Sequence, residues 1–93
     1  MTHDQILEFL SDWQEEDFLL ADGLEGAFVG VAYGKLRKPV ACYDRQKCIA
    51  ILMTRDGMTE DEAEEFFQFN VEDAWVGDRT PMFVVTASGG MSS

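Results

Sequence analysis

Residues 56–62 are the part of this chain that most constrains its fold. Asp56-Gly57 is typical of a helix end, because glycine readily adopts the left-handed conformation that closes a helix. Thr59 and Glu62 have the spacing of a capping box, in which a hydroxyl and a carboxylate accept hydrogen bonds from backbone amides at a helix start. The segment therefore predicts two successive helices joined by a very short connection.

The sequence also predicts where the first of these helices begins and where the second ends. Asp44 can cap a helix over residues 45–55, and the following helix is expected to run from Glu60 to about residues 75–77. The apolar face of the first is formed by Cys48, Ile49, Leu52 and Met53. The second is expected to bury Ala63, Phe66, Phe67, Asn70, Val71 and Ala74.

Three strands are predicted from β-branched and aromatic runs. Residues 27–33 and 40–43 flank a basic turn and form a hairpin, and residues 82–86 form a third strand that joins its edge. A long N-terminal helix is expected over residues 4–21, capped by Thr2 or Asp4 and ended by Asp22-Gly23. Its apolar stripe contains Ile6, Leu7, Leu10, Trp13 and Leu20, widened by Phe9 and Phe18.

The order α-β-β-α-α-β predicts an α+β fold. We expect a two-layer sandwich in which a three-stranded, mostly antiparallel sheet carries the helices on one face. With 93 residues, of which 46% are hydrophobic, the chain has the size and composition of one packed domain. The domain is expected over residues 1–87, followed by a flexible C-terminal tail at residues 88–93.

Part of the sequence resembles a family of small uncharacterised proteins encoded by bacteriophages and prophages. The resemblance is carried by residues 43–53, 55–59, 62–67, 69–71, 74–77 and 80–81, and extends over about residues 22–83. It implies a phage context and, for a phage protein, a location in the host cytoplasm. It implies no activity and no catalytic residue. The acidic N-terminal segment is an elaboration on the shared part.

The charges are sorted into blocks. Residues 1–34 contain eight acids and no Lys or Arg, residues 35–55 contain six basic side chains and one acid, and residues 56–93 contain nine acids and one Arg. The net charge of −11 repels nucleic acid and anionic membranes and attracts basic surfaces. With no signal peptide or membrane-spanning run in the sequence, we expect a cytoplasmic protein that binds neither nucleic acid nor membrane directly.

The residues offer little for catalysis. His3 is the single histidine, and no nucleophile arrangement is evident around it. Cys48 is either a thiol activated beside Lys47 or a small core residue. The acids at 60–65 lack the spacing of a calcium loop and suit a helix start. We therefore expect no catalytic residue, cofactor or metal site.

The acidic helical faces have two interpretations: a solvated surface, or a surface that imitates nucleic-acid phosphates and is offered to a basic groove. The second predicts a non-enzymatic binding module, such as a phage inhibitor that docks on a nucleic-acid-handling host complex. An anti-CRISPR protein that evades host defence is one example. If the first and last helices lie side by side, their acids form two parallel rows. The predicted partner-binding residues are Asp12, Glu15, Glu16, Asp61, Glu64 and Glu65.

The alternative is a self-associating structural or interaction module. The basic turn formed by Lys35, Arg37 and Lys38 can pair with the acids of a second copy. Exposed aromatic residues such as Trp13 and Trp75 are a further means of forming a homo-oligomer.

Overall fold

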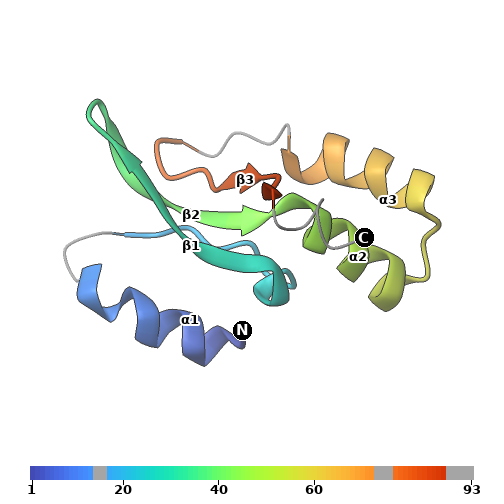
Figure 1. The fold of residues 1–93 in the computed structure, drawn as a ribbon, viewed down its shortest axis with the longest axis horizontal. Helices are drawn as coiled ribbons and strands as arrows, with labels where there is room; N and C mark the ends of the chain where they lie inside the picture. Colours follow the sequence, from blue (N-terminus) through green and yellow to red (C-terminus); the bar gives the residue numbers. More distant parts are fainter. Residues whose placement is uncertain (14–16, 73–76, 88–93) are drawn as a thin grey trace.

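The computed structural model describes residues 1–13, 17–72 and 77–87 and confirms the α+β class and the order of the elements. Figure 1 shows helices α2 and α3 side by side near one end of the sheet and the β1–β2 hairpin projecting at the other. The tail at residues 88–93 and the predicted end of the last helix at residues 73–76 lie outside the described residues. The elements are α1 (His3–Leu10), η1 (Ser11–Trp13), η2 (Glu25–Ala27), β1 (Phe28–Gly34), β2 (Arg37–Asp44), α2 (Arg45–Asp56), α3 (Glu60–Phe67), η3 (Gln68–Glu72) and β3 (Met82–Val84).

The boundaries of α2 and of the start of α3 are set by the predicted local hydrogen bonds. The Asp44 carboxylate accepts the Lys47 backbone N–H at 3.1 Å, and Gly57 ends α2 with a φ of 68°. At the start of α3, the Thr59 hydroxyl accepts the Glu62 N–H at 3.2 Å, while the Glu62 carboxylate accepts the Thr59 N–H at 2.9 Å. These contacts satisfy amides that the helices themselves leave unpaired.

The sheet has the order β1-β2-β3 and is mixed. β1 and β2 form the predicted antiparallel hairpin, with register shifts along β1. β3 runs parallel to β2 and pairs Met82 with Cys42 and Val84 with Asp44. A mostly antiparallel sheet was expected, but the chain returns through α2 and α3 before β3 begins, and such a long crossover allows parallel pairing.

The prediction of a helix over residues 4–21 is wrong beyond its first turns. α1 ends at Leu10, one 3₁₀ turn follows, and residues 17–21 have no helical structure. Instead, the Trp13 and Phe18 rings meet edge to face at 6.1 Å, and the Ala21 N–H donates to the Tyr43 hydroxyl at 2.8 Å. Burial of this segment against the core therefore overrides its helical periodicity.

The helices contact one face of the sheet, as predicted. Phe28 and Tyr43 lie opposite each other across the hairpin, with ring centroids 5.6 Å apart. The centroid of the Phe83 ring lies 5.9 Å from that of Tyr43 and 4.9 Å from that of Phe67, so Phe83 joins β3 to α3. Buried residues of all three helices complete the cluster: Ile6, Leu10, Cys48, Ile49, Leu52, Ala63 and Phe67.

Several side chains that were expected in the core are exposed. Four of them lie beside a buried residue of the same helix, at the edges of stripes that are covered only in part, and Asn70 lies in η3, which has no buried residue. These exposed side chains are Leu7, Phe9, Met53, Phe66 and Asn70.

None of the helices in the described part of the chain is long and apolar enough to cross a membrane.

Candidate functional site

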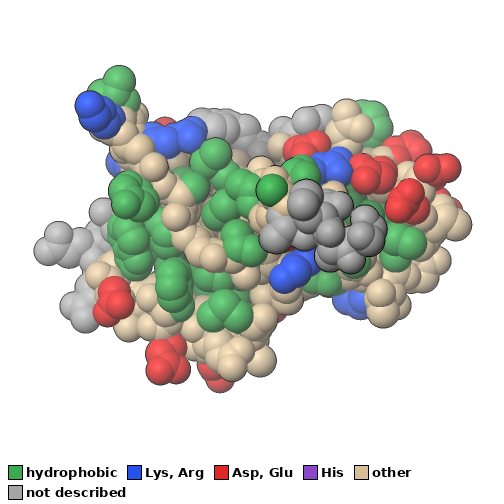
Figure 2. Space-filling view, in the orientation of Figure 1, with side chains coloured by type: hydrophobic (Ala, Val, Ile, Leu, Met, Phe, Trp, Pro, Cys, Tyr) green, Lys and Arg blue, Asp and Glu red, His purple; other side chains and the backbone are tan. Residues whose placement is uncertain are grey.

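Three of the predicted partner-binding residues, Asp61, Glu64 and Glu65, lie together on α3. The buried side chains Ala63 and Phe67 hold the helix against the core, which directs the intervening positions outward. Asp61 and Glu65 are exposed and one helical turn apart, so their carboxylates share a face. Figure 2 shows the acidic side chains gathered over α3 at one end of the molecule.

Glu64 differs from its neighbours because it is paired inside the fold. Arg45 donates two hydrogen bonds to its carboxylate, at 2.8 and 3.2 Å, and a third to Glu72 at 2.8 Å. The Arg45 guanidinium also lies 5.2 Å from the centroid of the Phe67 ring. The hydrogen bonds from Arg45 lower the pKa of Glu64, and those to Glu64 and Glu72 raise the pKa of Arg45. Glu64 therefore joins α3 to α2 as well as adding charge to the surface.

Of the three other predicted acids, the structure describes Asp12 alone, and Asp12 is not part of this surface. Asp12 is exposed on the 3₁₀ turn after α1, and Glu15 and Glu16 lie outside the described residues. Figure 1 shows α1 and α3 on opposite sides of the molecule. The condition for two parallel rows of acids is thus not met.

An apolar groove adjoins the acids of α3. It has a volume of about 370 Å³, with Met58, Phe66 and Phe69 as its apolar lining and Glu62, Glu65 and Asn70 as its polar lining. Phe66 is 39% exposed and Phe69 is 68% exposed. The sequence prediction placed Phe66 in the core, whereas the structure leaves it partly exposed beside the fully buried Phe67, at the edge of the buried stripe of α3. On α2 the adjacent residues Cys48 and Ile49 are both buried, so the position of Phe66 beside Phe67 gave no signal of its exposure.

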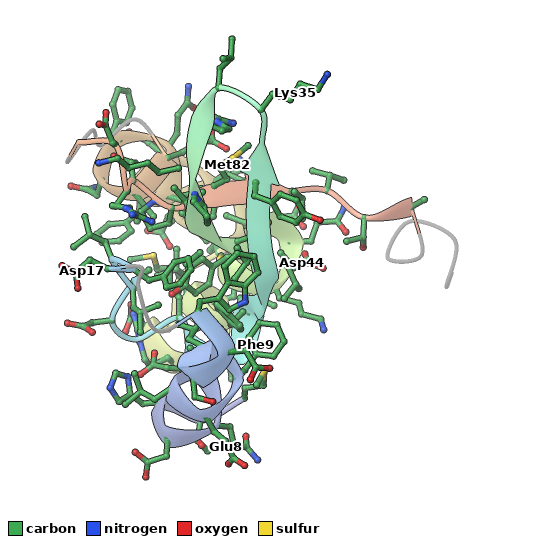
Figure 3. The ribbon with its side chains drawn as sticks, turned by 90° about the vertical axis from the view of Figure 1, so that its left-hand side faces the viewer. Glu8, Phe9, Asp17, Lys35, Asp44 and Met82 are labelled. Atoms are coloured by element: carbon green, nitrogen blue, oxygen red, sulfur yellow. The ribbon has the colours of Figure 1, made fainter. Side chains whose placement is uncertain are left out.

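The basic turn forms the tip of the β1–β2 hairpin, far from α3 (Figure 2). Lys35, Arg37 and Lys38 are exposed, and none of them forms an ion pair with a described residue. Arg37 instead contacts the Met82 sulfur at 3.2 Å. Leu36 lies among these cations with its side chain fully exposed. Figure 3 shows Lys35 at the projecting end of the hairpin and Glu8 of α1 at the other end of the view.

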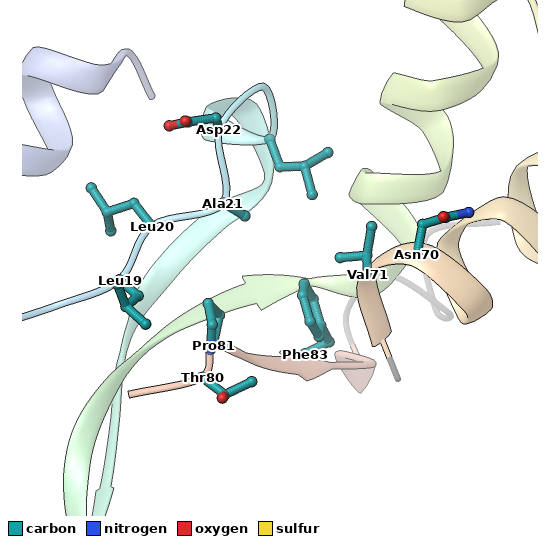
Figure 4. Close-up of a pocket in the computed structure, with 10 residues that line it drawn as sticks. Leu19, Leu20, Ala21, Asp22, Asn70, Val71, Thr80, Pro81 and Phe83 are labelled. Atoms are coloured by element: carbon teal, nitrogen blue, oxygen red, sulfur yellow. The ribbon is translucent and has the colours of Figure 1, made fainter. Parts of the chain in front are cut away.

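A second apolar pocket, of about 390 Å³, lies between the segment at residues 19–24 and the η3–β3 region (Figure 4). Leu19, Leu20, Val71, Pro81 and Phe83 contribute most of its apolar wall, and Asp22 is its single charged side chain. Such a lining suits contact with an apolar group. It does not bring together the acid, base and nucleophile that a reaction needs.

The two thiols are buried, and their role as core residues agrees with their surroundings. Cys48 is inaccessible to solvent, and its burial, assisted by the nearby Asp44 carboxylate, raises the pKa of its thiol to about 12. Burial also raises the pKa of the Cys42 thiol. A raised pKa disfavours the thiolate, which is the reactive form, at both positions. Within the described ranges, no group of three or more His, Cys, Asp or Glu side chains has a metal-binding arrangement.

Comparisons with known proteins yield no relative: no family model, no curated protein and no solved structure matches this chain.

Proposed function

We propose that this protein is a non-enzymatic binding module whose acidic α3 surface docks onto a basic protein surface. The observation that carries the proposal is the way the fold distributes its ion pairs. Arg45 pairs with Glu64 and Glu72, and Arg55 pairs with Asp56, within the same chain. Asp61 and Glu65 form no ion pair with the described part of the chain, and their charge is presented to solvent.

The partner class follows from this charge. A field of this sign steers the protein toward basic surfaces and away from nucleic acid. Grooves lined with Lys and Arg to hold phosphates are strong examples of such surfaces, and a row of carboxylates competes for them. We therefore propose a nucleic-acid-handling host complex as the target, with a CRISPR effector as one example. The resemblance to phage-encoded proteins suggests a phage context, in which a protein that occupies such a groove would act as an inhibitor.

The proposal is tested by capture on the tagged protein from a bacterial lysate, compared between two charge-reversed variants. Asp61→Lys/Glu65→Lys changes the α3 surface, and Glu8→Lys/Asp12→Lys makes the same charge change near α1. We expect the α3 variant alone to lose a set of basic nucleic-acid-binding proteins, and added duplex DNA to displace that set from the wild type. Equal retention by the wild type and the α3 variant would contradict the proposal.

A further inference from the structure

We propose that the hairpin tip of one copy of this chain docks into the α3 groove of a second copy, so that copies associate head to tail. The tip comprises residues 35–38, and the groove is the one lined by Met58, Phe66 and Phe69 with Glu62 and Glu65. Both halves of the contact are present in one chain, so the inference does not rest on a host partner; because the groove includes Glu65, a second copy and a host partner would compete for the α3 surface.

The tip has an uncommon combination of side chains. Leu36 is fully exposed at the end of a projecting hairpin, with Lys35 before it and Arg37 and Lys38 after it. A single exposed leucine is ordinary on a protein surface. Here it stands on an element that extends from the body of the molecule, and cations flank it on both sides. Asp78 and Thr80 line a pocket with the base of the tip and Arg37 contacts Met82, but the Leu36 side chain remains fully exposed and available for contact.

The groove complements the tip in both respects. Its apolar lining contains two exposed phenylalanines and Met58, which offer a leucine side chain a place away from water. Glu65 lines the groove and has no ion pair in the described structure, and Asp61 lies one turn before it on the same helical face. Glu62 uses one carboxylate oxygen to cap α3, which leaves the other oxygen without a partner in the described structure. Apolar contact in the centre with ion pairs at the rim is the usual anatomy of a protein interface.

The positions of the tip and the groove decide the kind of assembly. They lie toward opposite ends of a molecule whose longest extent is 39 Å (Figure 2). The tip of one copy therefore cannot reach the groove of the same copy. Two different surfaces form the contact, which makes the interface heterologous and leads to a ring or an open chain of copies. One tip in one groove is a small contact, and small interfaces are weak.

The test is the molar mass in solution, measured by light scattering and sedimentation. For the wild type, we expect the mass to rise from the 10.5 kDa of a monomer toward twice that value or more between about 20 μM and about 1 mM protein. We expect raising NaCl from about 50 mM to about 500 mM to reduce association, since salt screens exposed ion pairs. A wild type that stays monomeric throughout would overturn the proposal.

Two variants and their mixture identify the surfaces. Leu36→Asp removes the tip and Glu65→Lys alters the groove, both at exposed positions, and circular dichroism checks that each is folded. Each should be monomeric alone, and an equimolar mixture should form a 1:1 dimer, because one variant retains the groove and the other retains the tip. Failure of the mixture to form a dimer would refute head-to-tail docking.

The matched control is Leu7→Asp, the same substitution at an exposed leucine of α1. It should associate like the wild type. If it abolished association as Leu36→Asp does, the interface would lie elsewhere and the proposal would be wrong.

Discussion

The α2–α3 region and the N-terminal segment at residues 1–24 are both rich in acids, but the fold holds them in different ways. α2 and α3 have capping residues at their starts, Gly57 between them and Arg45 as a cation shared by two glutamates. The N-terminal segment contains no Lys or Arg, and only the start of α1 has a capping box. It is held instead by aromatic contacts and by the hydrogen bond from Ala21 to Tyr43. Local hydrogen bonds thus define one region, while distant packing defines the other.

The largest effect is expected where α3 meets the core. Phe67→Ala removes a fully buried ring that contacts Phe83 and Arg45, and should lower the free energy of unfolding by about 3–5 kcal/mol. Phe9→Ala in α1 is the matched substitution at a half-exposed ring and should cost about 1 kcal/mol. Urea unfolding followed by circular dichroism measures both. Equal costs would show that the two regions are held alike.

The next effect is expected at the cation that joins α2 to α3. Arg45→Ala removes the partner of Glu64 and Glu72 from a side chain that is 22% exposed, and should cost about 1–3 kcal/mol. Lys47→Ala, on the same helix and without an ion pair in the described structure, should change stability by less than about 0.5 kcal/mol. Thermal unfolding compares the two variants. If Lys47→Ala lowered the stability as much as Arg45→Ala, the ion pairs of Arg45 would not be what stabilises the contact between α2 and α3.

A smaller and more local effect is expected in the N-terminal segment. Tyr43→Phe deletes the hydroxyl that accepts the Ala21 N–H and should cost about 1 kcal/mol, because that amide is left without its partner. Hydrogen exchange at Ala21 should accelerate more than exchange within α2. Tyr33→Phe changes an exposed hydroxyl and is the control. Unchanged exchange at Ala21 would mean that the hydrogen bond does not hold the segment.

The smallest effect is expected on the pH dependence of stability. Arg45 lowers the pKa of Glu64 from an ordinary value of 4.5, so unfolding takes up a proton in this range and stability falls as the pH drops. The contribution of the Arg45–Glu64 pair to the free energy of unfolding is complete above about pH 5. It is lost as the pH falls through the lowered pKa of Glu64 in the folded protein. It is small because the Glu64 side chain is 45% exposed. In acid titrations of unfolding, Glu64→Gln should show a flatter dependence than the wild type, and an identical slope would disprove this assignment.

The contrast between the regions also explains how much could be predicted from the sequence. Asp44, Gly57 and the Thr59–Glu62 box act over three or four residues, so the start of α2 and its junction with α3 were predictable. The end of α1 was not, because contacts with Tyr43, more than twenty residues away, draw residues 17–21 out of the helix. The parallel pairing of β3 was likewise not predictable, because it depends on how α2 and α3 pack and on where they bring the chain back to the edge of β2.

For the candidate site, the polar face of α3 indicated the exposure of Asp61 and Glu65 correctly. The pairing of Glu64 with Arg45 spans 19 residues and two elements, so no local pattern reveals it. The sequence did not predict the groove, because an apolar residue at the edge of a helical stripe can be buried, like Ile49, or exposed, like Phe66, depending on how far the neighbouring elements cover it.

The parallel strand β3 has a consequence for the order of folding. The β1–β2 hairpin and the α2–α3 pair join residues that are close in the sequence, whereas Met82 must find Cys42 forty residues earlier. Closing a loop of that length reduces the entropy of the chain before any contact compensates for it. We therefore expect β3 to dock after the hairpin and the two helices have formed. Until it docks, the edge of β2 is open to pairing with another chain.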